Sequence, residues 1–188
     1  MRTLLPIIIV SVIVLLLVVI TYNRLVRALN MVREAWSGID VQLKRRYDLI
    51  PNLVAAVRGY AEYERSVQAQ LAALRAPALD SAQPHERGSA ENELSRSLKG
   101  LFALAEAYPQ LQASEQFLNL QRELAAIEDQ VQFARRYYNG SVRDYNILIH
   151  SFPSNLIAGL FHFTPREYFE LELVTERKPP VVDTGQTS

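Results

Sequence analysis

Apolar residues recur at alternating spacings of three and four along the stretch from Tyr22 to Leu74. A period of 3.5 residues keeps one stripe of a helix against a partner, so the spacing predicts a long helix with a coiled-coil-like seam. Arg46 and Glu64 are the charged exceptions. Because an unpaired buried charge is costly, we expect Arg46 to reach a carboxylate on another helix. The seam consists of Tyr22, Leu25, Leu29, Val32, Trp36, Ile39, Leu43, Arg46, Ile50, Leu53, Val57, Tyr60, Glu64, Val67, Leu71 and Leu74.

Pro51 lies inside this seam. A proline removes one backbone donor and normally bends or ends a helix, yet the apolar phase is the same on both sides of it. The surrounding residues 48–53 also lack the Gly and Ser of a reversal loop. One kinked helix over residues 22–75 is therefore favoured over two separate helices.

A second seam of the same period precedes Pro153 and predicts a long helix over residues 114–151, with Ser114 as its N-cap. Between the two seams, prolines and a glycine predict a loop over residues 76–89, and an amphipathic stripe predicts a helix over residues 90–108. None of these helices can bury its stripe alone, so the predicted fold is all-α: an elongated antiparallel helical bundle of the four-helix type. The second seam consists of Phe117, Leu120, Leu124, Ile127, Val131, Ala134, Tyr138, Ser141, Tyr145, Leu148 and Phe152, and the shorter stripe of Leu94, Leu98, Leu101, Ala105 and Tyr108.

The chain begins with an apolar run from Leu4 to Ile20 that is interrupted only by Pro6 and Ser11. As a helix it measures about 26 Å, close to the ~30 Å of a bilayer's hydrocarbon core. A cleaved signal peptide is the alternative, but the run is longer than such a core and Thr-Tyr-Asn-Arg-Leu follows it instead of small residues. We therefore predict a transmembrane anchor over residues 1–21.

Positive charges flank this span unequally: Arg2 precedes it, and Arg24, Arg27 and Arg33 follow it. This excess favours a cytoplasmic soluble domain over a periplasmic or extracellular one.

Asparagines accompany both seams at intervals of seven, Asn23 with Asn30 and Asn139 with Asn146, so each pair shares one face of its helix. Local or water contacts are the favoured interpretation. The alternative is a hydrogen-bonded set that joins the base of the first helix to the end of the last long helix.

After Pro153 the sequence predicts short C-terminal helices within residues 154–171. The first has Leu156 and Leu160 on one side, and the run 164–167 has the Thr, Pro and Glu of a typical helix start. Phe161 and Phe163 lie in an aromatic-rich region. We favour a lid that closes one end of the bundle over an exposed patch for a partner or the membrane interface. Residues 175–188 are predicted to form an extended or disordered tail.

The sequence contains no convergent set of reactive groups. None of the three histidines has a Glu three residues before it, and metalloprotease, P-loop and dinucleotide-binding motifs are absent. There are no cysteines, and the net charge of zero gives no field that favours nucleic acid. Glu115, Glu123, Glu128 and Asp129 fit a solvated helix face. We predict no enzymatic activity and no cofactor or metal, with a di-metal site built from carboxylates alone as the remaining alternative.

Several segments resemble the signature of the LemA family: residues 22–26, 34–54, 135–139, 145–146 and 152–155. The resemblance implies a bacterial single-pass protein of the cytoplasmic (inner) membrane, with a helical bundle over residues 22–174 and no established enzymatic activity. Related proteins of magnetosome-forming bacteria are associated with building a membrane compartment. As interaction or structural residues we single out Trp36, Asp40, Arg46, Asp48, Pro51, Asn52, Asn139, Asn146, Phe161 and Phe163.

Two functions are compatible with these observations. The first is a non-enzymatic scaffold or membrane-organising component that acts through protein–protein contacts, because the seams carry no chemistry. The second is an accessory subunit of a membrane protease or transport complex that docks through the aromatic C-terminal region. The expected partners are membrane lipid, through the N-terminal helix, other envelope or membrane proteins, and further copies of the chain; nucleic acid is not expected.

Overall fold

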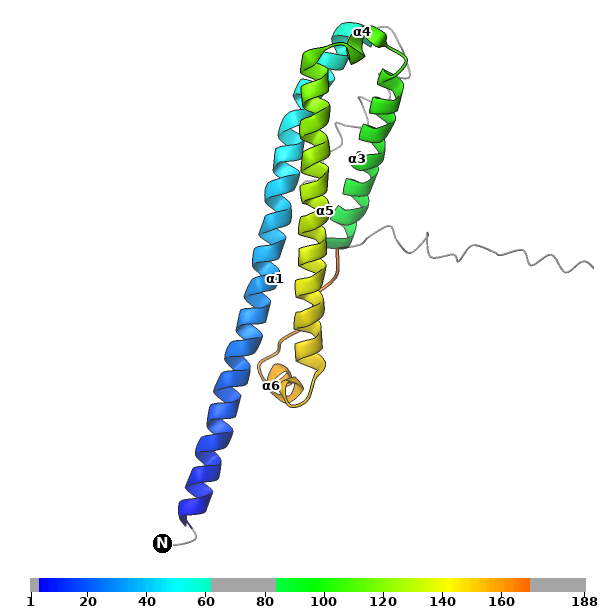
Figure 1. Cartoon of the computed structure of the whole chain (residues 1–188). Coiled ribbons are helices and arrows are strands. Elements are labelled where there is room, and N and C mark those ends of the chain that lie inside the picture. Colours follow the sequence, from blue (N-terminus) through cyan, green and yellow to red (C-terminus); the bar gives the residue numbers. More distant parts are fainter. Residues whose placement is uncertain (1–3, 62–83, 170–188) are drawn as a thin grey trace, which may run out of the picture.

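The structure is a computed structural model that describes residues 4–61 and 84–169. All regular elements in these two ranges are helices, so the predicted all-α fold is confirmed. Figure 1 shows an elongated bundle from which one helix protrudes at the N-terminal end. The helices are α1 (Leu4–Ala61), α3 (Pro84–Ala105), α4 (Pro109–Gln112), α5 (Glu115–His150) and α6 (Ser154–Leu160).

Helix α1 is a single element of 58 residues, which is about 87 Å at ~1.5 Å per residue. It contains both the apolar N-terminal run and the first seam, and it continues through Pro51. Pro51 lies on the exposed face, where water can satisfy the carbonyl that loses its backbone donor. The prediction of one helix rather than two is therefore confirmed as far as Ala61. The predicted continuation to residue 75 lies outside the described residues.

The two seams face each other across the antiparallel pair formed by α1 and α5 (Figure 1). One core cluster lies towards α4 and joins α1, α3, α4 and α5 through residues such as Leu53, Leu101 and Phe117. The other lies towards α6 and joins α1, α5 and α6 through residues such as Leu25 and Tyr145. The stripes of α1, α3 and α5 are thus buried against one another, as the period of 3.5 predicts.

Helix α3 begins at Pro84, earlier than the predicted start at residue 90. A proline is compatible with the first turn, whose N–H groups have no partner within the helix, and Glu86 favours the same turn through the helix dipole. The helix ends at Ala105, and Pro109 begins the single turn α4. The earlier part of the predicted loop, residues 76–83, lies outside the described residues.

The C-terminal end of the second seam differs from the prediction. Ser114 caps α5 as expected, with its side chain accepting from the Phe117 N–H at 3.5 Å. The helix ends at His150, however, and Phe152 lies in the following turn with 81% of its surface exposed. Phe152 is therefore not a member of the buried stripe.

The predicted helix start at residues 164–167 is wrong for the described residues, because 161–169 contain no helix. Helix α6 ends where His162 adopts a positive φ of 57° and the Phe163 N–H donates to the Ala158 carbonyl at 2.9 Å. This arrangement is a typical helix stop. The chain then continues as a segment without regular structure, Phe163–Phe169, called the C-terminal segment below.

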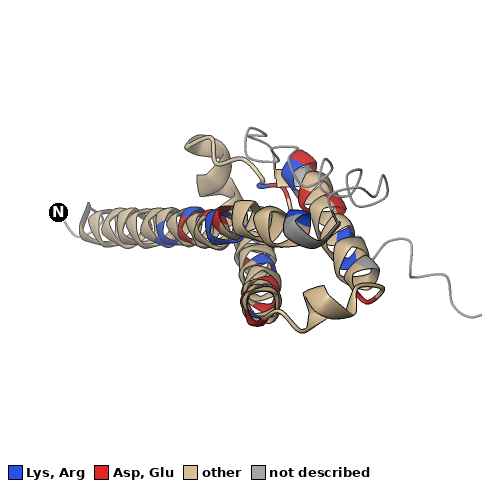
Figure 2. Cartoon of the chain, turned by 90° about the horizontal axis from the view of Figure 1, so that it is seen from above, with Lys and Arg blue, Asp and Glu red and all other residues tan. Residues whose placement is uncertain are grey.

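The N-terminal part of α1 is apolar and exposed on all sides. Side chains from Leu5 to Val10 are more than half exposed, and no charged residue colours this part of the helix in Figure 2. An apolar core helix of a soluble bundle would be buried, whereas none of this run is. It is the one helix in the described ranges that is long and apolar enough to cross a membrane.

Candidate functional site

A layer of buried charge joins α1, α3 and α5. Arg46 of α1 is only 1% exposed; its Nη2 lies 3.1 Å from Glu128 Oε2 of α5, and its Nη1 lies 3.5 Å from Glu91 Oε2 of α3. The same Nη2 donates to Ser95 Oγ at 2.8 Å. Arg46 thus reaches carboxylates on two other helices, as its place in the apolar seam predicts.

Tyr47 completes the buried charge layer, which consists of Arg46, Tyr47, Glu91, Ser95 and Glu128. The Tyr47 hydroxyl donates to Glu91 Oε1 at 2.5 Å. Burial raises the pKa of Tyr47, and the hydrogen bond to Glu91 raises it further, so the hydroxyl stays protonated as a donor. Burial also raises the pKa of Glu91, although Tyr47 and Arg46 oppose that shift. With each member paired, the geometry is that of a structural lock between three helices.

A second set of contacts lies beside this layer, at the start of α3. Arg87 Nη1 lies 2.6 Å from Asp40 Oδ1, and the Arg87 guanidinium stands over the Trp36 ring at 5.4 Å. Asp40 therefore pairs with α3, and not with Lys44 one turn along α1, which is exposed. On α5, Arg135 donates through Nη1 to Asn92 Oδ1 at 3.0 Å.

Trp36 also belongs to an aromatic cluster that ties down the C-terminal segment. Its ring lies 5.3 Å from that of Tyr138 on α5 and 6.1 Å from that of Phe169. Phe169 is fully buried, and the Arg135 guanidinium covers its ring at 4.8 Å. One tryptophan thus joins α1, α3, α5 and the C-terminal segment.

Asn139 and Asn146 of α5 hold the backbone of the same segment in an arrangement called the amide clamp below. The Asn139 side chain donates to the Phe169 carbonyl at 3.0 Å and accepts from the Phe169 N–H at 2.8 Å. Asn146 does the same with Arg166, at 2.8 and 2.9 Å. Because α5 takes the backbone groups of Arg166 and Phe169, these groups are not available to the predicted helix.

The asparagines of α1 do not join this arrangement. Asn30 accepts from Arg33 on its own helix at 3.4 Å, and Asn23 is exposed. The hydrogen-bonded set between the asparagines of α1 and α5 is therefore not formed. The interval of seven on α5 instead matches the spacing of two backbone sites in the C-terminal segment.

The remaining residues singled out from the sequence lie elsewhere. Phe161 and Phe163 contact Tyr22 of α1, with ring centroids 4.7 and 5.8 Å from that of Tyr22. Phe163 is half-buried, whereas Phe161 is 48% exposed, so the lid stays a prediction. Asp48, Pro51 and Asn52 are exposed on α1 and take part in none of these clusters.

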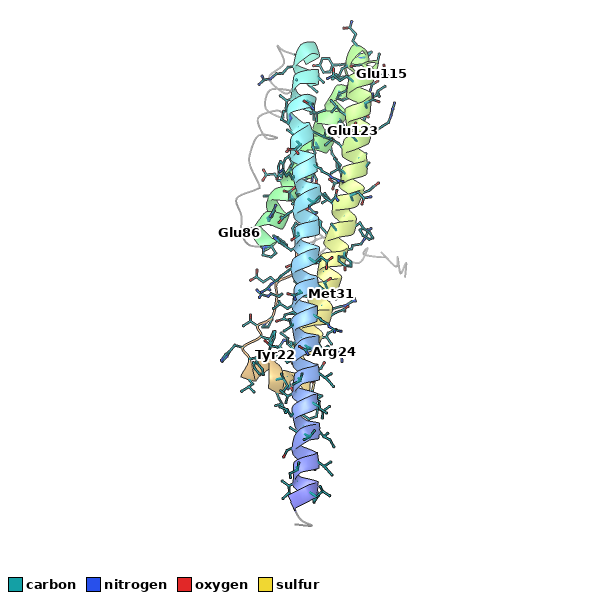
Figure 3. The ribbon with its side chains drawn as sticks, turned by 90° about the vertical axis from the view of Figure 1, so that its left-hand side faces the viewer. Tyr22, Arg24, Met31, Glu86, Glu115 and Glu123 are labelled. Atoms are coloured by element: carbon teal, nitrogen blue, oxygen red, sulfur yellow. The ribbon has the colours of Figure 1, made fainter. Side chains whose placement is uncertain are left out.

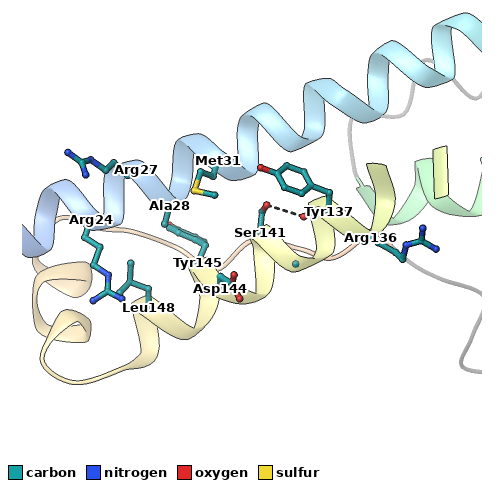
Figure 4. Close-up of a pocket in the computed structure, with 11 residues that line it drawn as sticks. Arg24, Arg27, Ala28, Met31, Arg136, Tyr137, Ser141, Asp144, Tyr145 and Leu148 are labelled. Atoms are coloured by element: carbon teal, nitrogen blue, oxygen red, sulfur yellow. Dashed lines mark hydrogen bonds between the residues drawn. The ribbon is translucent and has the colours of Figure 1, made fainter. Parts of the chain in front are cut away.

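An open groove of about 490 Å³ runs between α1 and α5. Figure 4 shows Met31 of α1 and Tyr137 of α5 in this groove, together with Arg24 and Asp144. Met31 and Tyr137 are each about half exposed. A second hollow of about 610 Å³ lies beside Trp36, where α3 and the C-terminal segment approach the helix pair. One side of the pair is thus covered, and the other is uncovered by any described residue.

Sequence reasoning missed the acidic partners of Arg46. Glu91 and Arg87 continue the stripe of Leu94 towards the start of α3 at spacings of three and four, so extending that stripe would have found them. Glu128 was assigned to a solvated face, but it is only 28% exposed and pairs with Arg46. No group of three or more His, Asp or Glu residues within residues 4–61 and 84–169 could hold a metal ion.

Comparison with known proteins adds a family and several relatives. The LemA family model matches residues 35–183. Magnetosome protein MamQ 2 of Paramagnetospirillum magneticum is 25% identical over 175 residues, which covers 79% of this chain. Protein LemA of Metamycoplasma hominis is 27% identical over 140 residues, 72% of this chain. The alignments span 64% and 63% of those two relatives, so the chain covers less than two thirds of their length.

Proposed function

Because the chain belongs to the LemA family of membrane-associated proteins, we propose that it is a non-enzymatic, single-pass protein of the bacterial inner membrane. In this proposal the bundle is a helical scaffold that acts through protein–protein contacts. The observation that carries it is the continuity of α1: one helix runs from the exposed apolar run into the core of the bundle. A helix without a break transmits orientation, so the span and the bundle move as one body.

The buried polar groups support a structural role. Arg46 and Glu91, the most deeply buried pair of opposite charges, bond to each other, and they also bond to Glu128 of α5 and Tyr47 of α1. These two side chains fix the position of α3, and because they are 1% and 0% exposed, a substrate could not reach them. We therefore assign the buried charge layer to the architecture of the scaffold.

The contact surface that we propose is the groove between α1 and α5. It presents two half-exposed apolar side chains, Met31 and Tyr137, and Phe133 lies one turn from Tyr137 on α5 with 62% exposure. The groove follows the helix pair and is also lined by Arg24, Arg27, Arg136 and Asp144, so the partner that we propose is a further helix with an apolar stripe flanked by polar residues. Confinement to a membrane raises the effective concentration of such partners, which favours weak lateral association.

The names of the relatives support a membrane-organising variant of this role, since MamQ 2 and MamQ are described as magnetosome proteins. For orientation we propose a cytoplasmic bundle, because Arg24, Arg27 and Arg33 follow the apolar run. A reporter that is active only in the cytoplasm, fused after Thr187, should be active. An inactive reporter with an active periplasmic counterpart would reverse the orientation.

The scaffold proposal is tested by photo-crosslinking in intact membranes. A photoreactive amino acid at Tyr137 should give discrete crosslinked species, which mass spectrometry identifies as a recurrent protein or a second copy of the chain. The matched control is Arg143, on the same helix but outside the lining of the groove, with a side chain that is 65% exposed. Monomer alone from Tyr137, or the same products from both positions, would contradict the proposal.

The adaptor alternative requires Phe161 and Phe163 to be available to another protein. Both rings contact Tyr22; Phe163 is half-buried, whereas Phe161 is 48% exposed. Replacing both with Ser should therefore loosen the lid and lower the melting temperature. Loss of a co-purifying protein with an unchanged melting temperature would favour the adaptor.

A further inference from the structure

Helix α6 lies at the level where the apolar run of α1 ends. Figure 1 places it at the end of the bundle from which α1 protrudes, and Figure 3 shows Tyr22 beside it. The Tyr22 and Phe161 ring centroids are 4.7 Å apart. Ile20 and Phe152 line the same small hollow of about 260 Å³. If α1 crosses a bilayer up to Ile20, the turn before α6 is at the surface of that bilayer.

The outer face of α6 is apolar and uncovered. Phe152, Leu156 and Leu160 are spaced four residues apart and are 81%, 62% and 68% exposed, whereas Ser154 and Ala158 are buried against the bundle. Three large side chains thus point outward, the reverse of what a water-exposed helix requires, while Ile157 packs against the bundle with the two small ones. Within the described ranges nothing covers this face.

The surrounding sequence is also uncharged. No Asp, Glu, Lys or Arg occurs between Asp144 and Arg166, a stretch that includes the end of α5, α6 and Phe163. The hollow beside Phe152 is lined by one residue of each charge, Arg24 of α1 and Asp144 of α5. An uncharged apolar face with an arginine and a tyrosine at its margin fits the boundary between acyl chains and anionic headgroups.

From this placement we propose that α6 and the turn at Phe152 insert into the membrane interface as a second, monotopic contact. The occupant of the face is the lipid bilayer. The chemistry is burial of Phe152, Leu156 and Leu160 among the acyl chains, with Arg24 at the phosphates. The face adjoins the end of the apolar run of α1, since Ile20 and Phe152 line one hollow, and it is apolar and uncharged like that run. Two contacts with the bilayer fix the tilt and rotation of the bundle, which a single span leaves free.

The test uses the full chain, which has no native cysteine, in vesicles of phosphatidylcholine and phosphatidylglycerol. A spin label is attached to Leu156→Cys or, independently, Leu160→Cys, and its collisions with oxygen and with a water-soluble nickel chelate are measured. Both substituted side chains are exposed, so the bundle should keep its helicity by circular dichroism. Val12→Cys in the apolar run and Ala125→Cys on an exposed position of α5 give the lipid and water references.

We expect labels at 156 and 160 to favour oxygen over the nickel chelate several-fold more than the label at 125, approaching the label at 12. A ratio equal to that at 125 would place α6 in water and overturn the proposal. Low accessibility to both reagents would mean that protein covers the face, which overturns it equally. These outcomes do not depend on the scaffold function, because the groove at Tyr137 is a separate surface.

Discussion

The buried charge layer and the amide clamp attach two different segments to the same pair of helices by different chemistry. The first holds α3 against α1 and α5 through an arginine and two glutamates. The second holds the C-terminal segment against α5 through two neutral amides. Each amide satisfies the backbone N–H and the backbone carbonyl of one residue at once. In the buried charge layer, by contrast, Arg46 is the cation that pairs with both Glu91 and Glu128, so removing one residue leaves another without its partner.

This difference in chemistry determines which structural feature each region fixes: the register of α3 or the backbone conformation of the C-terminal segment. A buried charge must be matched by a partner at a defined height along the bundle, so Arg46 fixes the register of α3 as well as its attachment. The amide clamp binds backbone atoms of the C-terminal segment. It therefore fixes an extended backbone conformation there, and its hydrogen bonds do not depend on which side chains the segment carries. Removing a charge should accordingly damage the whole bundle, whereas removing an amide should release one segment.

The largest effect is expected for Arg46→Ala. It leaves Glu91 buried without its cation, and breaking a buried pair in this way typically costs ~3–5 kcal/mol. The free energy of unfolding, measured by denaturant titration of the full chain in detergent micelles, should fall by that amount. Arg45→Ala is the control, because Arg45 is exposed on the same turn of α1. Equal stability of the two variants would show that the layer is not a lock.

A smaller and more local effect is expected for Asn139→Ala. The variant leaves the N–H and carbonyl of Phe169 without their partners, at a cost of ~1–3 kcal/mol. Hydrogen exchange followed by mass spectrometry should speed up in the C-terminal segment and stay unchanged in α3. Asn119→Ala on the same helix is the control, since Asn119 bonds only to the exposed Arg122 in the described ranges. Faster exchange throughout the bundle would erase the distinction between the two regions.

The two regions also differ in how far the sequence predicts them. Arg46 interrupts an apolar seam, and this signal alone predicts a buried charge that pairs with another helix. Glu91 likewise interrupts an apolar stripe, once the stripe of α3 is extended from Leu94 towards the start of the helix. Periodicity detects such residues because a helix repeats its environment every three or four positions.

The amide clamp gave no such signal. Asn139 and Asn146 stand beside the seam, and their partners are backbone atoms, which no side-chain pattern encodes. Local sequence was in fact misleading, because Thr164, Pro165 and Glu167 favour a helix start, while tertiary hydrogen bonds impose an extended segment. The boundary of α3 was missed for a related reason: Pro84 and Gly88 are typical of loops. A first helical turn tolerates the proline, and packing of the helix can override the cost of ~1 kcal/mol for a glycine in the second turn.

The pH dependence of the free energy of unfolding shows which of two effects is larger for Glu91: its burial away from water, or its attraction to Arg46. Burial raises the pKa of Glu91 above its ordinary value of 4.5, so the folded state takes up a proton more readily than the unfolded state. This contribution is fully present below pH 4.5 and is lost as the pH rises through the folded-state pKa. The wild type should therefore gain stability relative to Glu91→Gln as the pH is lowered from 7 towards 4.5. A relative loss over that range would mean that attraction to Arg46 dominates.

The smallest effect is expected for Arg143→Ala, which removes an ion pair of nearly the same length as that between Arg46 and Glu128. Arg143 Nε lies 3.2 Å from Asp144 Oδ1, against 3.1 Å for the buried pair. The Arg143 and Asp144 side chains are 65% and 70% exposed, however, so water and salt screen their attraction. We expect the free energy of unfolding to change by less than ~0.5 kcal/mol. A loss comparable to that of Arg46→Ala would show that distance, and not burial, sets the strength of charge pairs in this bundle.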